Sequence, residues 1–182
     1  MIKTAALVLA FLPLTDAAFA GSDWPNLQAG HLQKISGCQK IPPTIKKFLG
    51  PCKEETGSDG TIHAPITSFY KIPYGKEFAI TYLGSWPAPV SYLFELENGE
   101  ARQLSFATGD IKSGFRPTTS LGETKVDPKT GKLISYWFID SCGQDTLDYE
   151  WTYEIRDGTY DLVQTRGRNC NAGSWETLWE LK

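Results

Sequence analysis

Apolar and polar positions alternate with few exceptions near the C-terminus, where residues 149–165 read YEWTYEIRDGTYDLVQT. A period of two is typical of antiparallel strands that bury one face and expose the other to water. The predicted buried face holds Tyr149, Trp151, Tyr153 and Ile155. The predicted solvent face holds Glu150, Thr152, Glu154 and Arg156. The Asp157-Gly158 pair between the two halves predicts a two-residue hairpin turn.

Similar signals upstream predict strands over most of the chain after Thr61. Two segments are rich in β-branched and aromatic residues, namely IHAPITSFYKI and KEFAITYLG. A hairpin with an Asn98-Gly99 turn is predicted for VSYLFELENGEARQLSF, with one face formed by Val90, Tyr92, Phe94 and Leu96. A second hairpin is predicted for TKVDPKTGKLISYWFI, because its turn combines Asp127, Pro128 and Gly131. The last predicted strand, WETLWEL, would bury Trp175, Trp179 and Leu181.

These strands predict an all-β domain over residues 61–182, an antiparallel meander that forms a sandwich, an open barrel or propeller-like blades. Residues 21–60 are different, with more Pro, Gly and Lys and few β-branched runs. We predict that they form a short, partly helical N-terminal arm. Asp23 is a candidate cap for a short helix near Pro25, and PPTIKKFLG predicts one or two further helical turns.

The first 20 residues have the features of a cleavable secretory signal peptide. Lys3 supplies a positive charge, an apolar run follows, and Ala18-Phe19-Ala20 places small residues at the cleavage positions. The apolar run is shorter than the ~20 residues that cross a bilayer. We therefore expect cleavage after Ala20 and a periplasmic or secreted protein that is not inserted in the membrane.

Four cysteines follow the predicted signal peptide, namely Cys38, Cys52, Cys142 and Cys170. An even number of cysteines in an oxidising compartment predicts two disulfides, and three pairings are possible. Proximity in sequence favours Cys38–Cys52 and Cys142–Cys170, each contributing ~3–4 kcal/mol in the chain-entropy model. A metal site is the alternative, but the spacing lacks a CxxC motif and there are only two histidines.

Three ordered stretches, VDPKTGKLISYWFIDSCGQD, YEWTYEIRDGTYDLV and RNCNAGSWETLWEL, resemble the C-terminal half of a bacterial secreted family, domain of unknown function 1176. The resemblance covers residues 126–181. It is carried by the turn and cysteine positions Asp127, Pro128, Thr130, Gly131, Leu133, Cys142, Gly143, Asp157, Gly158, Leu162 and Cys170, and by the tryptophans Trp151, Trp175 and Trp179. It implies that Cys142 and Cys170 pair with each other, and it implies no activity.

The charge balance and the motifs limit the possible partners. The predicted signal peptide carries one Lys and one Asp, so the net charge stays at −3 without it. A mildly acidic chain lacks the basic surface that nucleic acids require, so we expect no nucleic-acid partner. The sequence holds neither a phosphate-binding loop nor a dinucleotide fingerprint, and we expect no cofactor.

Candidate catalytic residues are sparse. His31 and His63 are possible general bases, but no nucleophile motif accompanies them, and surface histidines are the more ordinary interpretation. Carboxylates gather around Cys142, and they comprise Asp140, Asp145, Asp148, Glu150 and Glu154. Such a cluster suits glycoside hydrolysis or Ca²⁺ binding, although acids on a solvent face are also ordinary and the Ca²⁺ ligand spacing is missing.

Two residues remain as candidate ligand contacts. Trp86 lies in GSWPAPV, where prolines and a glycine predict a stiff loop, and Arg116 lies in SGFRPTTS. A tryptophan on a rigid loop is a common contact for sugars or proteins, unless it folds back onto the core. We predict a non-catalytic binding module for a protein or cell-envelope ligand, such as an inhibitor or immunity protein for a cell-wall hydrolase. The alternatives are a polysaccharide hydrolase that uses the acids near Cys142, and a structural envelope protein.

Overall fold

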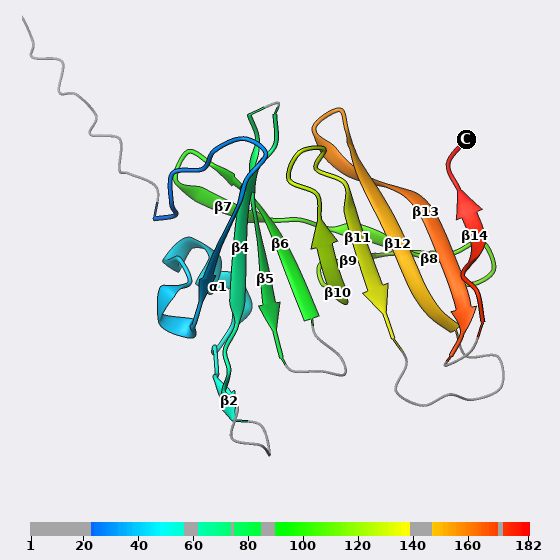
Figure 1. Cartoon of the computed structure of the whole chain (residues 1–182), viewed down its shortest axis with the longest axis horizontal. Helices are drawn as coiled ribbons and strands as arrows, with labels where there is room; N and C mark the ends of the chain where they lie inside the picture. The colour runs from blue at the N-terminus through cyan, green and yellow to red at the C-terminus, as the bar shows by residue number, and fades with distance from the viewer. Residues whose placement is uncertain (1–22, 57–61, 74, 85–89, 139–146, 171–172) are drawn as a thin grey trace, which may run out of the picture.

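A computed structural model describes residues 23–56, 62–73, 75–84, 90–138, 147–170 and 173–182 (Figure 1). Two five-stranded antiparallel sheets form the body of the fold. The first has the order β1 (Leu32–Ser36), β4 (Ile66–Lys71), β5 (Glu77–Leu83), β6 (Val90–Glu97) and β7 (Glu100–Gln103). The second has the order β10 (Glu123–Val126), β11 (Leu133–Trp137), β12 (Leu147–Arg156), β13 (Thr159–Asn169) and β14 (Glu176–Glu180). The predicted all-β, antiparallel class is confirmed.

Two small two-stranded pairs and a short helix complete the chain. The pairs are β2 (Glu55–Thr56) with β3 (Ile62–His63), and β8 (Phe106–Asp110) with β9 (Gly114–Thr118). The helix α1 (Pro43–Leu49) follows a 3₁₀ turn, η1 (Cys38–Lys40). No helix in the described part of the chain is long and apolar enough to cross a membrane.

The two sheets meet at β6, which contacts different neighbours along its length. Its first half approaches the segment before β10, where Ser91 and Leu121 exchange backbone hydrogen bonds of 2.7 and 2.9 Å. Its second half pairs with β7, from Phe94 to Glu97. The sheets therefore lie side by side in Figure 1 and are joined along part of one strand.

One hydrophobic core is shared by both sheets, as in a sandwich. Large apolar side chains from the two sheets and from β8 meet in it, among them Tyr70, Phe78, Leu93, Phe106, Leu133, Trp151 and Tyr153. Phe106 of β8 packs edge-on against Tyr153 of β12, with ring centroids 5.1 Å apart. Aromatic burial of this kind is a main stabilising contribution, at roughly 25 cal/mol per Å² of apolar surface.

The N-terminal arm contributes β1 to the first sheet, and the rest of it covers the other face of this sheet. Trp24, Ile41 and Ile45 pack there against Phe69 and Phe94. The helix predicted from PPTIKKFLG is confirmed as α1, and the disulfide Cys38–Cys52 (2.12 Å) closes the loop that contains it. Both faces of β6 are consequently buried. The face with Tyr92, Phe94 and Leu96 lies under the arm, and the face with Leu93 lies in the shared core.

The helix predicted near Pro25 is wrong. Residues 25–28 have no regular secondary structure. Asp23 instead binds the start of α1, accepting hydrogen bonds from the Thr44 amide at 3.2 Å and hydroxyl at 2.9 Å. Asp23 thus satisfies a free helical amide, as a capping residue does, but for a helix that begins about 20 residues later. A local sequence pattern identified the capping residue and assigned it to the wrong helix.

The hairpin turns form as predicted. Asn98 and Asp157 adopt positive φ angles of 52° and 48°, followed by Gly99 at 78° and Gly158 at 80°, which is the geometry of a type I′ turn. In the Asp127 turn, the carboxylate accepts hydrogen bonds from the Lys129 amide and the Thr130 hydroxyl. These contacts lower the pKa of the exposed Asp127 carboxyl below its ordinary value.

The predicted solvent face of β12 is wrong at Glu150 and Thr152, which are buried, whereas Glu154 is half-buried and Arg156 is exposed. Glu150 and Thr152 are only 7% and 5% exposed. Directly across the strand pair, Arg166 binds Glu150 at 2.9 Å and Arg168 binds Asp148 at 3.0 Å. The aliphatic parts of the two arginine side chains cover this face, while their guanidinium groups neutralise the carboxylates. Charged residues can therefore be buried here.

The last strand also departs from the prediction that Trp175, Trp179 and Leu181 share a buried face. A bulge in β13 between Thr165 and Arg166 shifts its register against β14. Trp175 lies against the guanidinium of Arg168, 4.7 Å from the ring centroid, whereas Trp179 packs on Phe115 of β9. Leu181 remains 41% exposed.

Candidate ligand cleft

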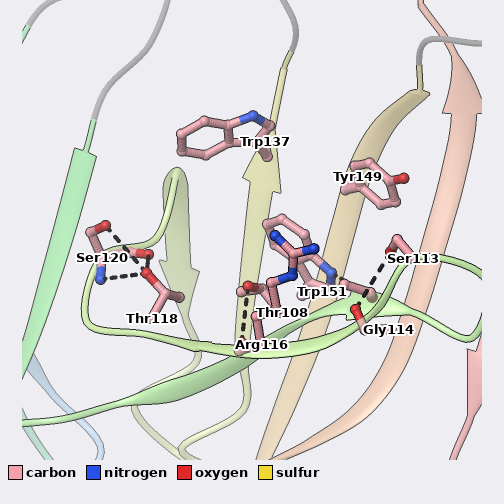
Figure 2. Close-up of a pocket in the computed structure, with 10 residues that line it drawn as sticks. Thr108, Ser113, Gly114, Arg116, Thr118, Ser120, Trp137, Tyr149 and Trp151 are labelled. Atoms are coloured by element: carbon pink, nitrogen blue, oxygen red, sulfur yellow. Dashed lines mark hydrogen bonds between the residues drawn. The ribbon is translucent and has the colours of Figure 1, made fainter.

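An open cleft of about 420 Å³ lies between the β8–β9 hairpin and strands β11 and β12 (Figure 2). This volume falls within the ~300–1,000 Å³ of typical small-molecule sites. Hydroxyl, aromatic and glycine residues dominate its lining, which consists of Thr108, Gly109, Ser113, Gly114, Arg116, Thr118, Ser120, Trp137, Tyr149 and Trp151.

Aromatic side chains form the wall on the side of the second sheet. Tyr149 and Trp151 of β12 stack with ring centroids 5.5 Å apart and an interplanar angle of 5°. Trp137, at the end of β11, is paired in register with Tyr149 and is 41% exposed (Figure 2). An exposed tryptophan beside a rigid aromatic stack leaves a ring available to a ligand.

Side chains of the second sheet hold β8 in place through its backbone carbonyls. The Trp151 Nε1–H donates to the Gly109 carbonyl at 3.2 Å, and the Thr165 hydroxyl donates to the same oxygen at 3.0 Å. The Tyr153 hydroxyl donates to the Ala107 carbonyl at 2.9 Å. These groups fix the hairpin across the sheet although no strand of the sheet pairs with β8.

The tip of the hairpin is organised by Asp110. Its carboxylate accepts hydrogen bonds from the Lys112 and Ser113 amides, both at 2.7 Å, and from the Tyr149 hydroxyl at 3.2 Å. Burial acts to raise the pKa of the Asp110 carboxyl, but these bonds outweigh it, and the pKa is lowered. Burial and the nearby Asp110 charge raise the pKa of the Tyr149 hydroxyl, which stays protonated and donates.

Arg116 supplies the positive charge of the cleft. It lies on β9 opposite Thr108, is exposed, and points toward the aromatic wall (Figure 2). The other arginines, Arg102, Arg156, Arg166 and Arg168, each form an ion pair with a carboxylate. Among the residues that the structure describes, no carboxylate lies within ion-pair distance of Arg116.

The predicted site residues are dispersed. Arg116 lies in the cleft, whereas Trp86 lies outside the described residues. Cys170 is disulfide-bonded, and its expected partner Cys142 lies outside the described residues. His31 is exposed before β1, and His63 belongs to β3, far along the chain from the cleft residues.

Of the carboxylates predicted near Cys142, the three that the structure describes do not line the cleft. Asp148 and Glu150 point to the opposite face of β12, where they pair with Arg168 and Arg166. Glu154 lies 3.7 Å from Arg156 in an exposed pair. The other two members of the predicted cluster, Asp140 and Asp145, lie outside the described residues. Within the described ranges, no group of three His, Cys, Asp or Glu side chains is arranged to hold a metal ion.

Sequence reasoning missed the central cleft residues Trp137, Tyr149 and Trp151. The alternation along β12 placed Tyr149 and Trp151 on a buried face, and this is confirmed, since Trp151 belongs to the core and Tyr149 packs against it. The pattern did not indicate that the same rings also line a cleft, and Trp137 was treated as one more strand residue. The available signal was the segment ATGDIKSGF, whose Asp-Ile-Lys-Ser-Gly turn predicts a short polar hairpin.

Comparisons with protein-family models, curated proteins and solved structures found no match for this chain. The resemblance to domain of unknown function 1176 therefore stays a prediction.

Proposed function

We propose that the protein is an exported, non-catalytic binding module that holds a saccharide of the cell envelope in the cleft beneath the β8–β9 hairpin. The observation that carries this proposal is the 41% exposed Trp137 beside the stacked Tyr149–Trp151 pair. Sugar rings present apolar C–H faces and polar edges, and sites that bind them combine aromatic surfaces with hydroxyl donors. Thr108, Thr118 and Ser120 supply hydroxyl groups on the facing wall.

The shape and rigidity of the site support a small ligand. A concave pocket of about 420 Å³ suits one or a few sugar rings better than the flat surface of a protein partner. Two of the wall residues are held by hydrogen bonds to the hairpin, Trp151 to the Gly109 carbonyl and Tyr149 to the Asp110 carboxylate, so the site is largely formed before a ligand arrives. A preformed site avoids the entropic cost of ordering loops during binding.

A non-catalytic role is supported by the pairing of the nearest described acids. Asp148 and Glu150 are each neutralised by an arginine on the face away from the cleft. Asp110 is committed to hydrogen bonds within its own turn. The positive charge in the cleft belongs to Arg116, whose guanidinium offers N–H donors and no acceptor.

Binding to isolated peptidoglycan and envelope polysaccharides tests the proposal. We expect the wild-type protein to be retained and Trp137→Ala to lose at least about tenfold in affinity, since a truncated hot-spot tryptophan costs about 2 kcal/mol or more. Phe48→Ala is the matched control, because Phe48 is similarly exposed (38%) but belongs to α1. If no glycan is retained, or if Trp137→Ala binds as well as the wild type, the cleft is not a saccharide site.

A further inference from the structure

We propose that the cleft selects an acidic saccharide, in which a sugar ring stacks on Trp137 while its carboxylate pairs with Arg116. This inference rests on the proposed function and adds the chemical class of the ligand. It follows from three features of the site: the unpaired arginine, the position of this arginine on the hairpin that faces the aromatic wall, and the amount of charge in the lining.

The unpaired state of Arg116 is the first argument. The formal charge of the chain is −3, and each of the other four arginines named above contacts a carboxylate. Arg116 is instead placed in the cleft lining without such a partner among the described residues. A planar guanidinium binds a carboxylate through two parallel hydrogen bonds, so a carboxylate on the ligand would complete the pairing.

The position of Arg116 is the second argument. Arg116 and Thr108 form a cross-strand pair on the hairpin, and the Thr108 hydroxyl donates to the Arg116 carbonyl at 3.4 Å. Trp137 and Trp151 lie on the facing sheet (Figure 2). A ligand between hairpin and sheet therefore meets an aromatic ring on one side and a cation on the other.

The amount of charge favours a carboxylate over a phosphate. A phosphate monoester carries about −1.5 to −2 charges near neutral pH, whereas a carboxylate carries one. Arg116 is the one cationic side chain among the described lining residues. One guanidinium balances one carboxylate, and the buried Asp110 carboxylate at the hairpin tip disfavours a second negative charge nearby.

Titration with a matched pair of disaccharides tests this inference. The probes are a glucuronic-acid-terminated disaccharide and its neutral, glucose-terminated counterpart, measured by calorimetry in about 20 mM and about 300 mM salt, where screening differs strongly. We expect the wild type to bind the acidic sugar at least about tenfold more tightly in low salt, a preference that shrinks in high salt. A sulfated disaccharide in a third titration distinguishes general anion binding from carboxylate selection.

Three variants locate the effect. Arg116→Gln is expected to bind both sugars with the affinity of the wild type for the neutral one. Arg156→Gln removes a comparably exposed arginine outside the cleft and should keep the preference. Trp137→Ala should weaken both sugars equally. Circular dichroism melting checks that each variant remains folded.

The outcomes separate the two proposals. If both sugars bind equally, if Arg116→Gln keeps the preference, or if the sulfated sugar binds more tightly than the carboxylate, acidic selection is wrong and the saccharide cleft stands. If neither disaccharide binds and envelope glycans are also not retained, the proposed function itself fails. If the disaccharides do not bind but glycans are retained through Trp137, acidic selection is overturned for rings of this type.

Discussion

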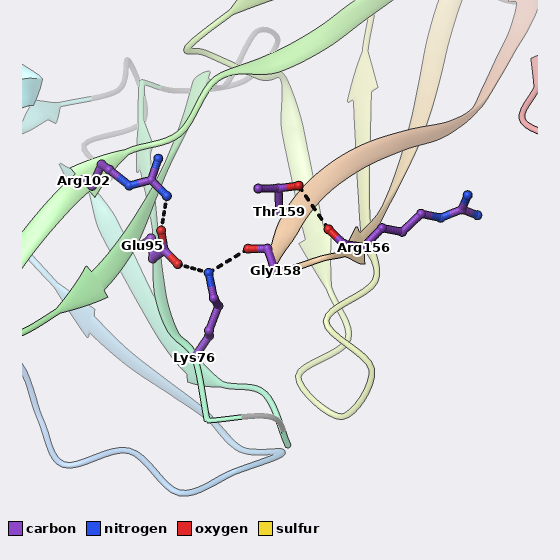
Figure 3. A network of polar contacts seen from close by, with 6 residues as sticks. All are labelled: Lys76, Glu95, Arg102, Arg156, Gly158 and Thr159. Atoms are coloured by element: carbon purple, nitrogen blue, oxygen red, sulfur yellow. Dashed lines mark hydrogen bonds and ion pairs between the residues drawn. The ribbon is translucent and has the colours of Figure 1, made fainter.

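The ammonium of Lys76 donates a hydrogen bond of 2.7 Å to the carbonyl oxygen of Gly158 (Figure 3). Lys76 precedes β5 in the first sheet, and Gly158 forms the β12–β13 turn of the second. The same ammonium binds the Glu95 carboxylate, which Arg102 also binds. Close by, the Tyr70 and Tyr160 hydroxyls share a hydrogen bond of 2.8 Å. Polar contacts therefore connect the two sheets at a point distant in sequence from the Ser91–Leu121 bridge.

Removing Lys76 should weaken the contact between the sheets. In Lys76→Met, Glu95, which is 7% exposed, keeps Arg102 as a partner but loses the lysine ammonium. The Gly158 carbonyl loses its hydrogen bond from Lys76. We expect a loss of about 2 kcal/mol in the free energy of unfolding, measured by urea denaturation, because a buried charge loses a hydrogen-bonded partner. Lys47→Met is the control, since the Lys47–Glu100 pair is exposed (50% and 71%) and should cost under about 1 kcal/mol. Equal losses in the two variants would contradict this role of Lys76.

The Glu95 contacts also predict how stability depends on pH. Burial acts to raise the pKa of the Glu95 carboxyl, but hydrogen bonds from Lys76 and Arg102 outweigh it and lower the pKa in the folded state. A carboxyl with a lowered folded pKa binds protons less tightly when folded. Its stabilising contribution is complete above the unfolded pKa, ~4.3 for Glu, and is lost as pH falls through the folded value.

We therefore expect the urea concentration at the unfolding midpoint to decrease as the pH is lowered from about 5 to 3. The decrease should be less steep in Glu95→Gln. Asp110 and Asp127, whose pKa values are also lowered, contribute a residual decline in both proteins. Parallel pH profiles for wild type and Glu95→Gln would show that Glu95 is not coupled to folding in this way.

Gly109 should tolerate no side chain, because its backbone approaches the opposite strand of the hairpin. A Cβ at Gly109 would lie 2.2 Å from the Gly114 carbonyl oxygen, and the φ angle of Gly109 is +119°. Gly114 also has a positive φ, +79°, but a Cβ there meets nothing within 4 Å. We expect Gly114→Ala to cost about 1–2 kcal/mol from backbone strain, and Gly109→Ala clearly more. Similar unfolding free energies for the two variants would contradict the observed close approach of β8 and β9.

The hairpins were predictable because their turn signals are local. Asn98-Gly99 and Asp157-Gly158 require positive φ angles, and the hairpins form at those turns. The cleft was not predictable, because it depends on long-range contacts such as that between Gly109 and Trp151, which are 42 residues apart. A period-two pattern also cannot distinguish an exposed polar face from one covered by ion pairs, as for Glu150 and Arg166. Arg116 was identified from its Pro-containing segment, but its unpaired state became visible only once the other arginines were placed.

Two fully buried serines offer a matched test of hydrogen bonding. The Ser91 hydroxyl donates to the Gly122 carbonyl at 2.7 Å, whereas the Ser135 hydroxyl has no hydrogen-bond partner among the described residues. We expect Ser91→Ala to lower the unfolding free energy by about 1–2 kcal/mol, and Ser135→Ala to leave it unchanged or raise it slightly. The comparison requires only equilibrium unfolding of the two variants. A larger loss for Ser135→Ala would mean that its hydroxyl has a partner.

The most direct test of the cleft is a titration followed by the indole N–H resonances in two-dimensional NMR. Each of the six tryptophans gives one such signal. On addition of the glucuronic-acid-terminated disaccharide, we predict shifts of the Trp137 and Trp151 signals. The signals of Trp24, buried where the arm packs on the first sheet, and of Trp175, which lies against Arg168, should stay fixed. Binding that moves Trp175 or Trp24 and leaves Trp137 unchanged would contradict a ligand site beneath the β8–β9 hairpin.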